Sequence, residues 1–214
     1  MTLVKLCGLN TDESVIAARE AGADMLGFMF YPKSPRAISI DQAQHLASLA
    51  GDMVKVAVTV DPDDEILHTL AASGAVDMVQ LHGSETPERI AEIKQLTSLP
   101  AMKAIKVATR DDMAVVSAYE KVADRILFDA KAPKGMQGAL PGGNALSFDW
   151  TLLEGLELGL PWMLSGGLHP GNVAEAIRLT GATEVDTSSG IEDAPGKKNV
   201  DKIRAFVESV REAY

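Results

Sequence analysis

Short runs of apolar and β-branched residues alternate with longer amphipathic segments from one end of the chain to the other. Apolar runs of about four to eight residues bounded by turn-forming residues indicate buried strands, and apolar residues spaced about three to four positions apart indicate helices. The pattern predicts that each strand is followed by a helix. The eight predicted strands start near Leu3, Met25, Val54, Met78, Ala101, Arg125, Trp162 and Glu184.

Two predicted helices have clear start signals. One spans residues 11–21, with Thr11 or the preceding Asn10 as its N-cap. Another spans residues 62–73, with Asp61 as its cap and a proline in its first turn. Several helices are expected to end on a glycine, because glycine adopts the left-handed conformation that closes many helices. These glycines are Gly22, Gly51, Gly74 and Gly181.

The spacing of the strands predicts a closed α/β barrel. Successive strands start roughly 22 to 29 residues apart at every step but one, which is the length of one strand plus one crossover helix. The sequence has no early Gly-x-Gly-x-x-Gly turn of the kind that is typical of an open dinucleotide-binding sheet. We therefore predict a single (β/α)8 TIM barrel domain over residues 1–214.

The step from the sixth strand to the seventh is about ten residues longer than the others and places extra chain in residues 131–147. This segment is rich in glycine and proline and includes Lys134-Gly135-Met136-Gln137-Gly138. Long connections of this kind in compact domains are usually lids or binding loops, and we predict that role here. A surface excursion without a function is the alternative.

The composition narrows the choice of ligand and compartment. Of the 214 residues 46% are hydrophobic, and 30 acidic against 20 basic residues give a net charge of −10, so we predict no nucleic-acid surface and expect local groups to hold any anionic ligand. A single cysteine, Cys7, excludes an internal disulfide, and without a histidine cluster we predict no metal site. No signal peptide or membrane-spanning run is found, which predicts a cytoplasmic protein without membrane partners.

Two glycine-serine segments follow the last two predicted strands. They are residues 164–168, Leu-Ser-Gly-Gly-Leu, and residues 185–190, Val-Asp-Thr-Ser-Ser-Gly. Glycine lets the backbone approach a ligand closely, and N–H groups at the start of a helix favour an anion. Because the loops after the seventh and eighth strands of such a barrel lie side by side, we predict a phosphate site there. Its predicted residues are Ser165, Gly166, Gly167, Ser188, Ser189 and Gly190.

Polar or reactive side chains also lie at the ends of other predicted strands, where barrel enzymes bind their substrates. Cys7 ends the first strand, Gln80 and His82 end the fourth, Asp129 ends the sixth, and Arg36 follows the second. Ordinary structural explanations exist as well. Cys7 could be an inert core thiol, His82 could be bonded to a neighbouring loop, with Gln80 similar, and Arg36 could be a solvated surface arginine.

These residues belong to a series of short motifs that runs through nearly the whole chain. The motifs are Lys-x-Cys-Gly (5–8), Ser-Pro-Arg (34–36), Gln-Leu-His-Gly (80–83), Asp129, Pro-Gly-Gly (141–143), Phe-Asp-Trp (148–150), Leu-Ser-Gly-Gly-Leu (164–168), Asp-x-Ser-Ser-Gly-x-Glu (186–192) and Pro-Gly-Lys-Lys (195–198). Each alone is weak, but together and in this order they resemble the phosphoribosylanthranilate isomerase family of tryptophan biosynthesis.

The resemblance implies an Amadori rearrangement of N-(5-phosphoribosyl)anthranilate to 1-(2-carboxyphenylamino)-1-deoxyribulose 5-phosphate, without metal or cofactor. It implies that Asp129 is the acid that protonates the ring oxygen and that Cys7 is the base that removes the proton from C2′. A thiol with an ordinary pKa of about 8.5 is mostly protonated at neutral pH, so Cys7 needs positive charge or N–H groups nearby. Lys5 lies on the same side of the strand, but alternation places it deeper in the barrel, and its role stays open.

Position and resemblance together suggest the substrate contacts. Arg36 is predicted to bind the anthranilate carboxylate through its guanidinium fork. Gln80 and His82 are predicted to contact the substrate. Asp186 either binds the amine or the ribose hydroxyls, or caps the helical turn that starts at Ser188.

The resemblance also assigns Gly142 and Gly143 to the phosphate site. The sequence departs from the family at residues 144–145, which are Asn-Ala where many members have glycine in the second position. Alanine disfavours the left-handed conformation, so the contribution of this loop to phosphate binding stays open.

Two other functions are compatible with the residues. Another phosphate-binding barrel, such as an indole-glycerol-phosphate synthase or an aldolase that forms a Schiff base through Lys5, Lys103 or Lys106, has the same fold. A non-catalytic sensor of phosphoribosyl ligands needs the phosphate site but neither Cys7 nor Asp129. In each case the predicted partner is a small phosphorylated molecule, and the protein is a monomer or a homodimer.

Overall fold

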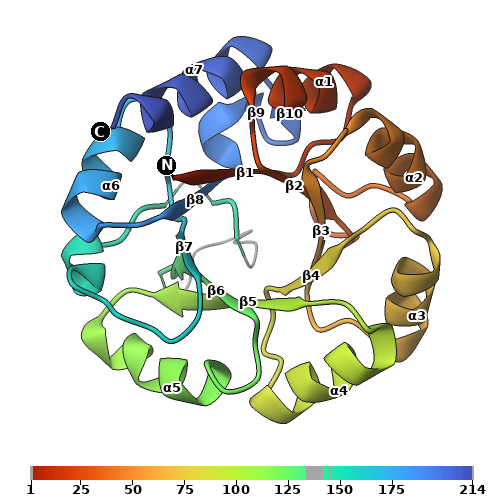
Figure 1. Cartoon of the computed structure of the whole chain (residues 1–214), viewed down its shortest axis with the longest axis horizontal. Coiled ribbons are helices and arrows are strands. Elements are labelled where there is room, and N and C mark those ends of the chain that lie inside the picture. Colours follow the sequence, from red (N-terminus) through yellow and green to blue (C-terminus); the bar gives the residue numbers. More distant parts are fainter. Residues whose placement is uncertain (1, 134–141, 145, 214) are drawn as a thin grey trace.

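Each predicted apolar run forms a strand, and the strands close into the predicted barrel (Figure 1). The computed structural model describes residues 2–133, 142–144 and 146–213. All eight strands begin at the predicted residues, and neighbouring strands are parallel, with β1 paired to β8 to close the ring. The strands are β1 (Leu3–Cys7), β2 (Met25–Met29), β3 (Val54–Thr59), β4 (Met78–Leu81), β5 (Ala101–Val107), β6 (Arg125–Ala130), β7 (Trp162–Leu164) and β8 (Glu184–Thr187).

Helices surround the barrel (Figure 1). The α-helices are α1 (Asp12–Ala21), α2 (Ile40–Leu49), α3 (Asp64–Ala72), α4 (Pro87–Thr97), α5 (Val116–Tyr119), α6 (Val173–Thr180) and α7 (Val200–Arg211). The 3-10 helices are η1 (Arg110–Val115), η2 (Trp150–Leu153) and η3 (Ser189–Ile191), and a hairpin of β9 (Glu192–Ala194) and β10 (Lys197–Lys198) follows η3.

The connection from β6 to β7 differs from the predicted strand-helix alternation. Its described part contains the short helix η2 in place of an α-helix. The physical reason lies in the sequence, because this connection is long and is rich in glycine and proline, which interrupt a continuous α-helix.

One predicted helix start is correct and the other is wrong. The Thr11 side chain caps α1 by accepting a hydrogen bond from the Ser14 backbone N–H. Helix α3 begins two residues later than predicted and is capped by Asp63, whose side chain accepts from Ile66 N. Asp61 instead has a positive φ of 45° and binds the backbone N–H of Ser84 at 2.7 Å. An N-cap residue has an extended backbone, as Asp63 has, whereas Asp61 is left-handed and its side chain is bound to another loop.

The predicted glycines mark the helix ends to within one residue. Gly22 and Gly181 are left-handed C-caps, as predicted. Gly51 and Gly74 also have positive φ, but each lies one residue beyond the cap of its helix. The turn chemistry was therefore predicted more accurately than the boundary.

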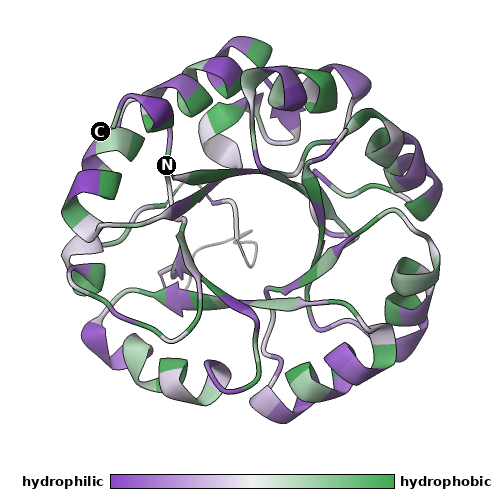
Figure 2. Cartoon of the chain, viewed as in Figure 1, coloured by the Kyte–Doolittle hydropathy of each residue, from purple (hydrophilic) through white to green (hydrophobic). Residues whose placement is uncertain are grey.

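Apolar side chains fill two layers of the molecule. A large cluster lies between the strands and the surrounding helices, whose outer surfaces are polar (Figure 2). The second cluster fills the amino-terminal part of the barrel interior, and each of its residues Met78, Leu127 and Met163 lies two positions before a polar residue that faces the opposite end. The barrel therefore has a packed apolar base and a polar mouth. Among the described helices, none is long and apolar enough to span a membrane.

Candidate active site

A cavity opens at the carboxyl ends of the barrel strands. Its empty volume, including the open mouth, is about 740 Å³. The cavity brings together all the predicted site residues except Gly190. Those that line it are Cys7, Arg36, Gln80, His82, Asp129, Gly142, Gly143, Ser165, Gly166, Gly167, Asp186, Ser188 and Ser189.

Cys7 lies beside a buried lysine on the same strand. The side chain of Lys5 is fully buried and forms a 2.8 Å ion pair with Oδ1 of Asp186 on β8, and its ammonium group interacts electrostatically with the thiol of Cys7. Opposite them is Gly27 of β2, where a Cβ atom would lie 2.9 Å from the sulfur and 3.3 Å from Lys5 Nζ. A glycine at this position therefore leaves room for the thiol and the ammonium group, and the structure places Lys5 next to the predicted base.

The surroundings of Cys7 act on its pKa in opposite directions. Burial raises the pKa, because the thiolate loses its hydration, and the negative charge of Asp186 adds to this effect. Lys5 opposes the increase most strongly, followed by Lys198 and Arg36. The positive charge that the sequence analysis required is present, yet the thiol pKa stays above its ordinary value in the free protein.

Asp129 ends a chain of hydrogen bonds that crosses the barrel mouth. Its Oδ2 atom lies 3.1 Å from His82 Nε2, and Nδ1 of the same ring lies 3.1 Å from the amide nitrogen of Gln80. Because an amide nitrogen only donates, Nδ1 accepts and the ring donates from Nε2 to Asp129. The structure thus places Gln80 and His82 in the cavity wall, where they orient the predicted acid.

The loop after β7 has the backbone geometry that its glycines allow. Gly166 and Gly167 have φ values of +84° and +68°, in the left-handed region that favours glycine. A Cβ at Gly166 would lie 2.9 Å from the backbone nitrogen of Ala130, so β6 also closes on this loop. The prediction placed these glycines at the start of the next helix. Helix α6 instead begins at Val173, several residues after them.

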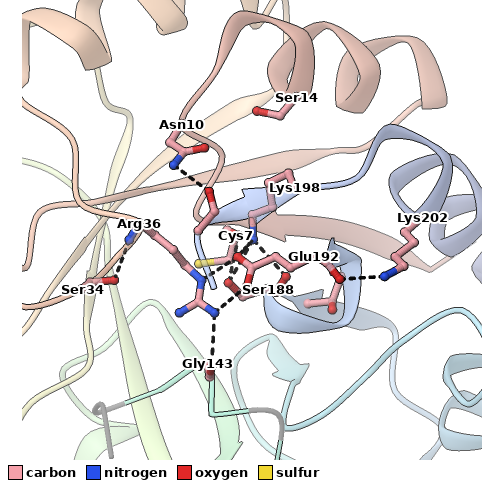
Figure 3. Close-up of polar contacts among 12 residues, drawn as sticks. Cys7, Asn10, Ser14, Ser34, Arg36, Gly143, Ser188, Glu192, Lys198 and Lys202 are labelled. Carbon is pink, nitrogen blue, oxygen red and sulfur yellow. Dashed lines mark hydrogen bonds and ion pairs between the residues drawn. The ribbon is translucent and has the colours of Figure 1, made fainter. Parts of the chain in front are cut away.

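The loop after β8 is tied to the first strand. Ser188 donates a hydrogen bond from Oγ to the backbone oxygen of Cys7 at 3.1 Å (Figure 3). Gly190 packs against the backbone oxygen of Leu168, which also accepts a 2.7 Å hydrogen bond from Thr187 Oγ1. Gly190 is not one of the described residues that line the cavity. Because it has no side chain, it allows the two predicted phosphate loops to approach each other.

Asp186 does not cap the turn that follows β8. Ser188 occupies the N-cap position of η3, and the Asp186 carboxylate points to Lys5 and to Ser165, whose Oγ donates to Oδ2 at 3.2 Å. The capping alternative was therefore wrong, because the buried ammonium of Lys5 is the stronger partner for this carboxylate.

Arg36 is buried, and two charged residues that the sequence analysis left without a role surround it. Its guanidinium donates from Nε and Nη2 to the two oxygens of Glu192 at 2.7 and 2.8 Å (Figure 3). Lys198 donates to Oε1 of the same carboxylate at 2.8 Å. Glu192 and Lys198 belong to the β9–β10 hairpin, so the solvated-arginine explanation of Arg36 is wrong.

The described residues of the long loop line the acid and arginine side of the cavity. A Cβ at Gly142 would lie 2.7 Å from His82 Nε2 and 2.9 Å from Asp129 Oδ2. The backbone oxygen of Gly143 accepts from Arg36 Nη2 at 3.3 Å. Residues 134–141 and 145 lie outside the described residues, and with them the predicted lid and the question about Ala145.

Two of the three lysines of the aldolase alternative are buried in ion pairs. A Schiff-base lysine requires a lowered pKa, whereas the pKa of Lys5 is raised, because Asp186 and Cys7 outweigh the lowering effect of burial. Lys103 is buried in an ion pair with Glu85 at 2.7 Å. Among the residues described, no cluster of His, Cys, Asp or Glu could hold a metal ion.

Comparisons with known proteins identify the family of the chain. The family model described as "N-(5'phosphoribosyl)anthranilate (PRA) isomerase" matches residues 4–209. A protein of Paramagnetospirillum magneticum named N-(5'-phosphoribosyl)anthranilate isomerase is 51% identical over 209 residues, which cover 97% of this chain and 96% of that protein.

Solved structures agree in fold over the full length. A phosphoribosylanthranilate isomerase of Thermotoga maritima superposes with a TM-score of 0.86 at 34% identity, covering 99% of each chain. Another structure of such an isomerase, bound to reduced 1-(o-carboxyphenylamino)-1-deoxyribulose 5-phosphate, has a TM-score of 0.83 at 33% identity over 99% of each chain. The chain therefore belongs to the N-(5'-phosphoribosyl)anthranilate isomerase family.

Proposed function

We propose that this protein converts N-(5-phosphoribosyl)anthranilate to 1-(2-carboxyphenylamino)-1-deoxyribulose 5-phosphate in the cytoplasm. The observation that carries the proposal is that Cys7 and Asp129 line one cavity together with the two glycine-serine loops. Strands β6, β7, β8 and β1 are consecutive in the barrel, so the acid and the base flank the loops that bind the phosphate.

The substrate is held at its two charged ends. The phosphate binds to residues 165–167 and 188–189, and the anthranilate carboxylate binds to Arg36. Asp186 lines the same cavity and binds the amine or a ribose hydroxyl of the substrate. Anchoring both ends places the ribose between the Cys7 sulfur and the Asp129 carboxyl group, which converts the reaction into an intramolecular process with fixed geometry.

The reaction then needs two catalytic proton transfers. The protonated carboxyl group of Asp129 gives its proton to the ring oxygen as the C1′–O bond breaks, and the nitrogen lone pair forms the C1′ iminium. The Cys7 thiolate removes the C2′ proton, and the electron pair of the C–H bond forms the enolamine and neutralises the iminium. Transfer of a proton from the C2′ hydroxyl to C1′ gives the ketone, so the overall change is an isomerisation without an oxidant or reductant.

The raised pKa of Cys7 predicts that its thiol reacts slowly with an alkylating agent at neutral pH. Because burial raises the thiol pKa in the free protein, the thiolate fraction is small at neutral pH and grows as the pH approaches that pKa. Cys7 is the single cysteine of the chain, so we expect the rate of alkylation by iodoacetamide to increase from neutral to alkaline pH. Mass spectrometry measures this rate, and circular dichroism shows that the protein stays folded. Alkylation that is fast at neutral pH and does not change with pH contradicts a raised thiol pKa.

The function itself is tested by following the fluorescence of phosphoribosylanthranilate after addition of the purified protein. We expect loss of the substrate signal at a rate proportional to protein concentration, and formation of the ketose product in equal amount. Calorimetry with the reduced product analogue provides the comparison. Binding of the analogue without any turnover of the substrate supports the sensor alternative and overturns the enzymatic proposal.

A further inference from the structure

Glu192 occupies one side of the Arg36 guanidinium. Its two carboxylate oxygens lie 2.7 Å from Nε and 2.8 Å from Nη2, and the side chains of both residues are less than 5% exposed (Figure 3). A guanidinium can pair with a carboxylate along its side, through Nε and one Nη, or across its end, through the two Nη atoms. The side of Arg36 is therefore already used within the protein.

The end of the guanidinium is directed toward the cavity wall. Nη1 lies against Gly143, where a Cβ would be 2.8 Å away, and both residues line the cavity. The backbone oxygen of Gly143 takes one proton of Nη2 in a longer, 3.3 Å hydrogen bond. A ligand carboxylate that binds across the end of Arg36 therefore takes Nη1 and replaces the Gly143 oxygen on Nη2, while the side that Glu192 holds is closed to it.

Lys198 keeps this arrangement positively charged. Glu192 alone neutralises Arg36 and would remove its attraction for a ligand anion. The buried Lys198 ammonium donates to Glu192 Oε1 at 2.8 Å and to the backbone oxygen and Oγ of Ser188 at 2.9 and 3.2 Å, which uses all three of its protons. Burial raises the pKa of Glu192, but Arg36 and Lys198 together lower it by a larger amount, so the carboxylate is ionised at neutral pH. Burial lowers the pKa of Lys198, and the charge of Glu192 opposes this decrease. With Lys198 protonated, two cations and one anion leave a net charge of +1 facing the ligand.

We infer that Glu192 is a positioning residue that determines specificity for the carboxylate of the substrate: it holds the side of Arg36 and so aims the Nη1–Nη2 end at the aryl carboxylate. The inference rests on the proposed function, in which Arg36 binds that carboxylate. Glu192 itself does not contact the substrate, and its effect acts through Arg36.

The test compares two ligands that differ only in the carboxylate. One is reduced 1-(o-carboxyphenylamino)-1-deoxyribulose 5-phosphate, and the other is the same compound with an unsubstituted phenyl ring. Isothermal titration calorimetry gives Kd for each, and their ratio measures what the carboxylate contributes. We expect the wild-type protein to prefer the carboxylated ligand by about 10- to 100-fold, since hydrogen bonds to charged groups are of that strength.

Glu192→Gln removes a negative charge beside Arg36, which by itself favours the carboxylated ligand. The guanidinium also loses the charge-assisted hydrogen bond that orients it, and we expect this loss to outweigh the charge effect. The preference is therefore expected to fall about tenfold, through weaker binding of the first ligand, while Kd of the second stays within about twofold. A merely structural role would weaken both ligands equally and leave the ratio unchanged, which overturns the inference. Asp193→Asn is the matched control on the same hairpin, where the carboxylate is half-exposed, and it should keep the wild-type ratio. If Glu192→Gln does not fold, Glu192→Asp carries the same test, because the shorter side chain withdraws from Nε.

Arg36→Met separates the two proposals. Loss of the preference in Arg36→Met together with its retention in the Glu192 variants overturns the role of Glu192 alone. Retention of the preference in Arg36→Met overturns the binding role of Arg36 and the inference that depends on it. Loss in Arg36→Met and partial loss in Glu192→Gln supports both.

Discussion

Substitution of Asp129 by Asn or of Cys7 by Ser is expected to lower kcat for N-(5-phosphoribosyl)anthranilate by about 10²- to 10⁴-fold, the usual contribution of a general acid or base. Asparagine has the size of the carboxyl group, and its single amide oxygen can still accept a hydrogen bond from one of the two donors, His82 and the backbone of Ala130, but it cannot deliver a proton to the ring oxygen. Serine replaces the thiol with a hydroxyl whose pKa is far higher, so the base is lost while the cavity keeps its shape.

Binding provides the control for this prediction. Neither residue belongs to the phosphate loops or to the Arg36 site, so Kd of the reduced product analogue is expected to change by only a few fold in calorimetry. Asp41→Asn, at an exposed aspartate in the first turn of α2, is the matched variant and should turn over like the wild type. Undiminished kcat in either active-site variant would remove that residue from the mechanism.

The fold was predictable because the strands are buried on both faces. Parallel strands inside a barrel read as continuous apolar runs, and all eight starts, from Leu3 to Glu184, follow from that pattern. The helix limits were less accurate where two signals competed. At the start of α3 both Asp61 and Asp63 are possible caps, and the choice depends on a tertiary contact of Asp61 with Ser84 that no local pattern contains.

The part of the candidate site that lies at the strand ends was predictable from the sequence. Cys7, Asp129 and Asp186 meet in one cavity because the carboxyl ends of all strands of a barrel face the same side. Glu192 and Lys198 were missed as functional residues, since charged residues in a hairpin with proline and glycine look like surface positions. Their partner Arg36 is 156 residues away from Glu192 in the sequence, and only the Glu of the 186–192 motif hinted at a role.

Lys5→Met is expected to lower the free energy of unfolding by about 3–5 kcal/mol, because it leaves the buried carboxylate of Asp186 without its ion pair. The two residues are 181 positions apart and are register partners where β1 meets β8, so the pair lies at the closure of the barrel. Urea denaturation followed by circular dichroism at neutral pH measures the change. The pKa of Lys5 is raised, so its stabilising contribution is present below the ordinary lysine pKa and is lost as the pH rises through the raised value.

The burial of this ion pair, rather than its chemistry, determines the size of the effect, and Lys55 provides the matched comparison. Lys55 forms a 2.9 Å ion pair with Asp77, whose side chain is 47% exposed, so Lys55→Met is expected to cost only about 0–1 kcal/mol. The double variant Lys5→Met with Asp186→Asn should recover part of the loss, because it removes the uncompensated charge. Equal losses for Lys5→Met and Lys55→Met would show that the Lys5–Asp186 pair contributes no more than a surface contact, and the barrel closure would then depend on backbone hydrogen bonds and apolar packing alone.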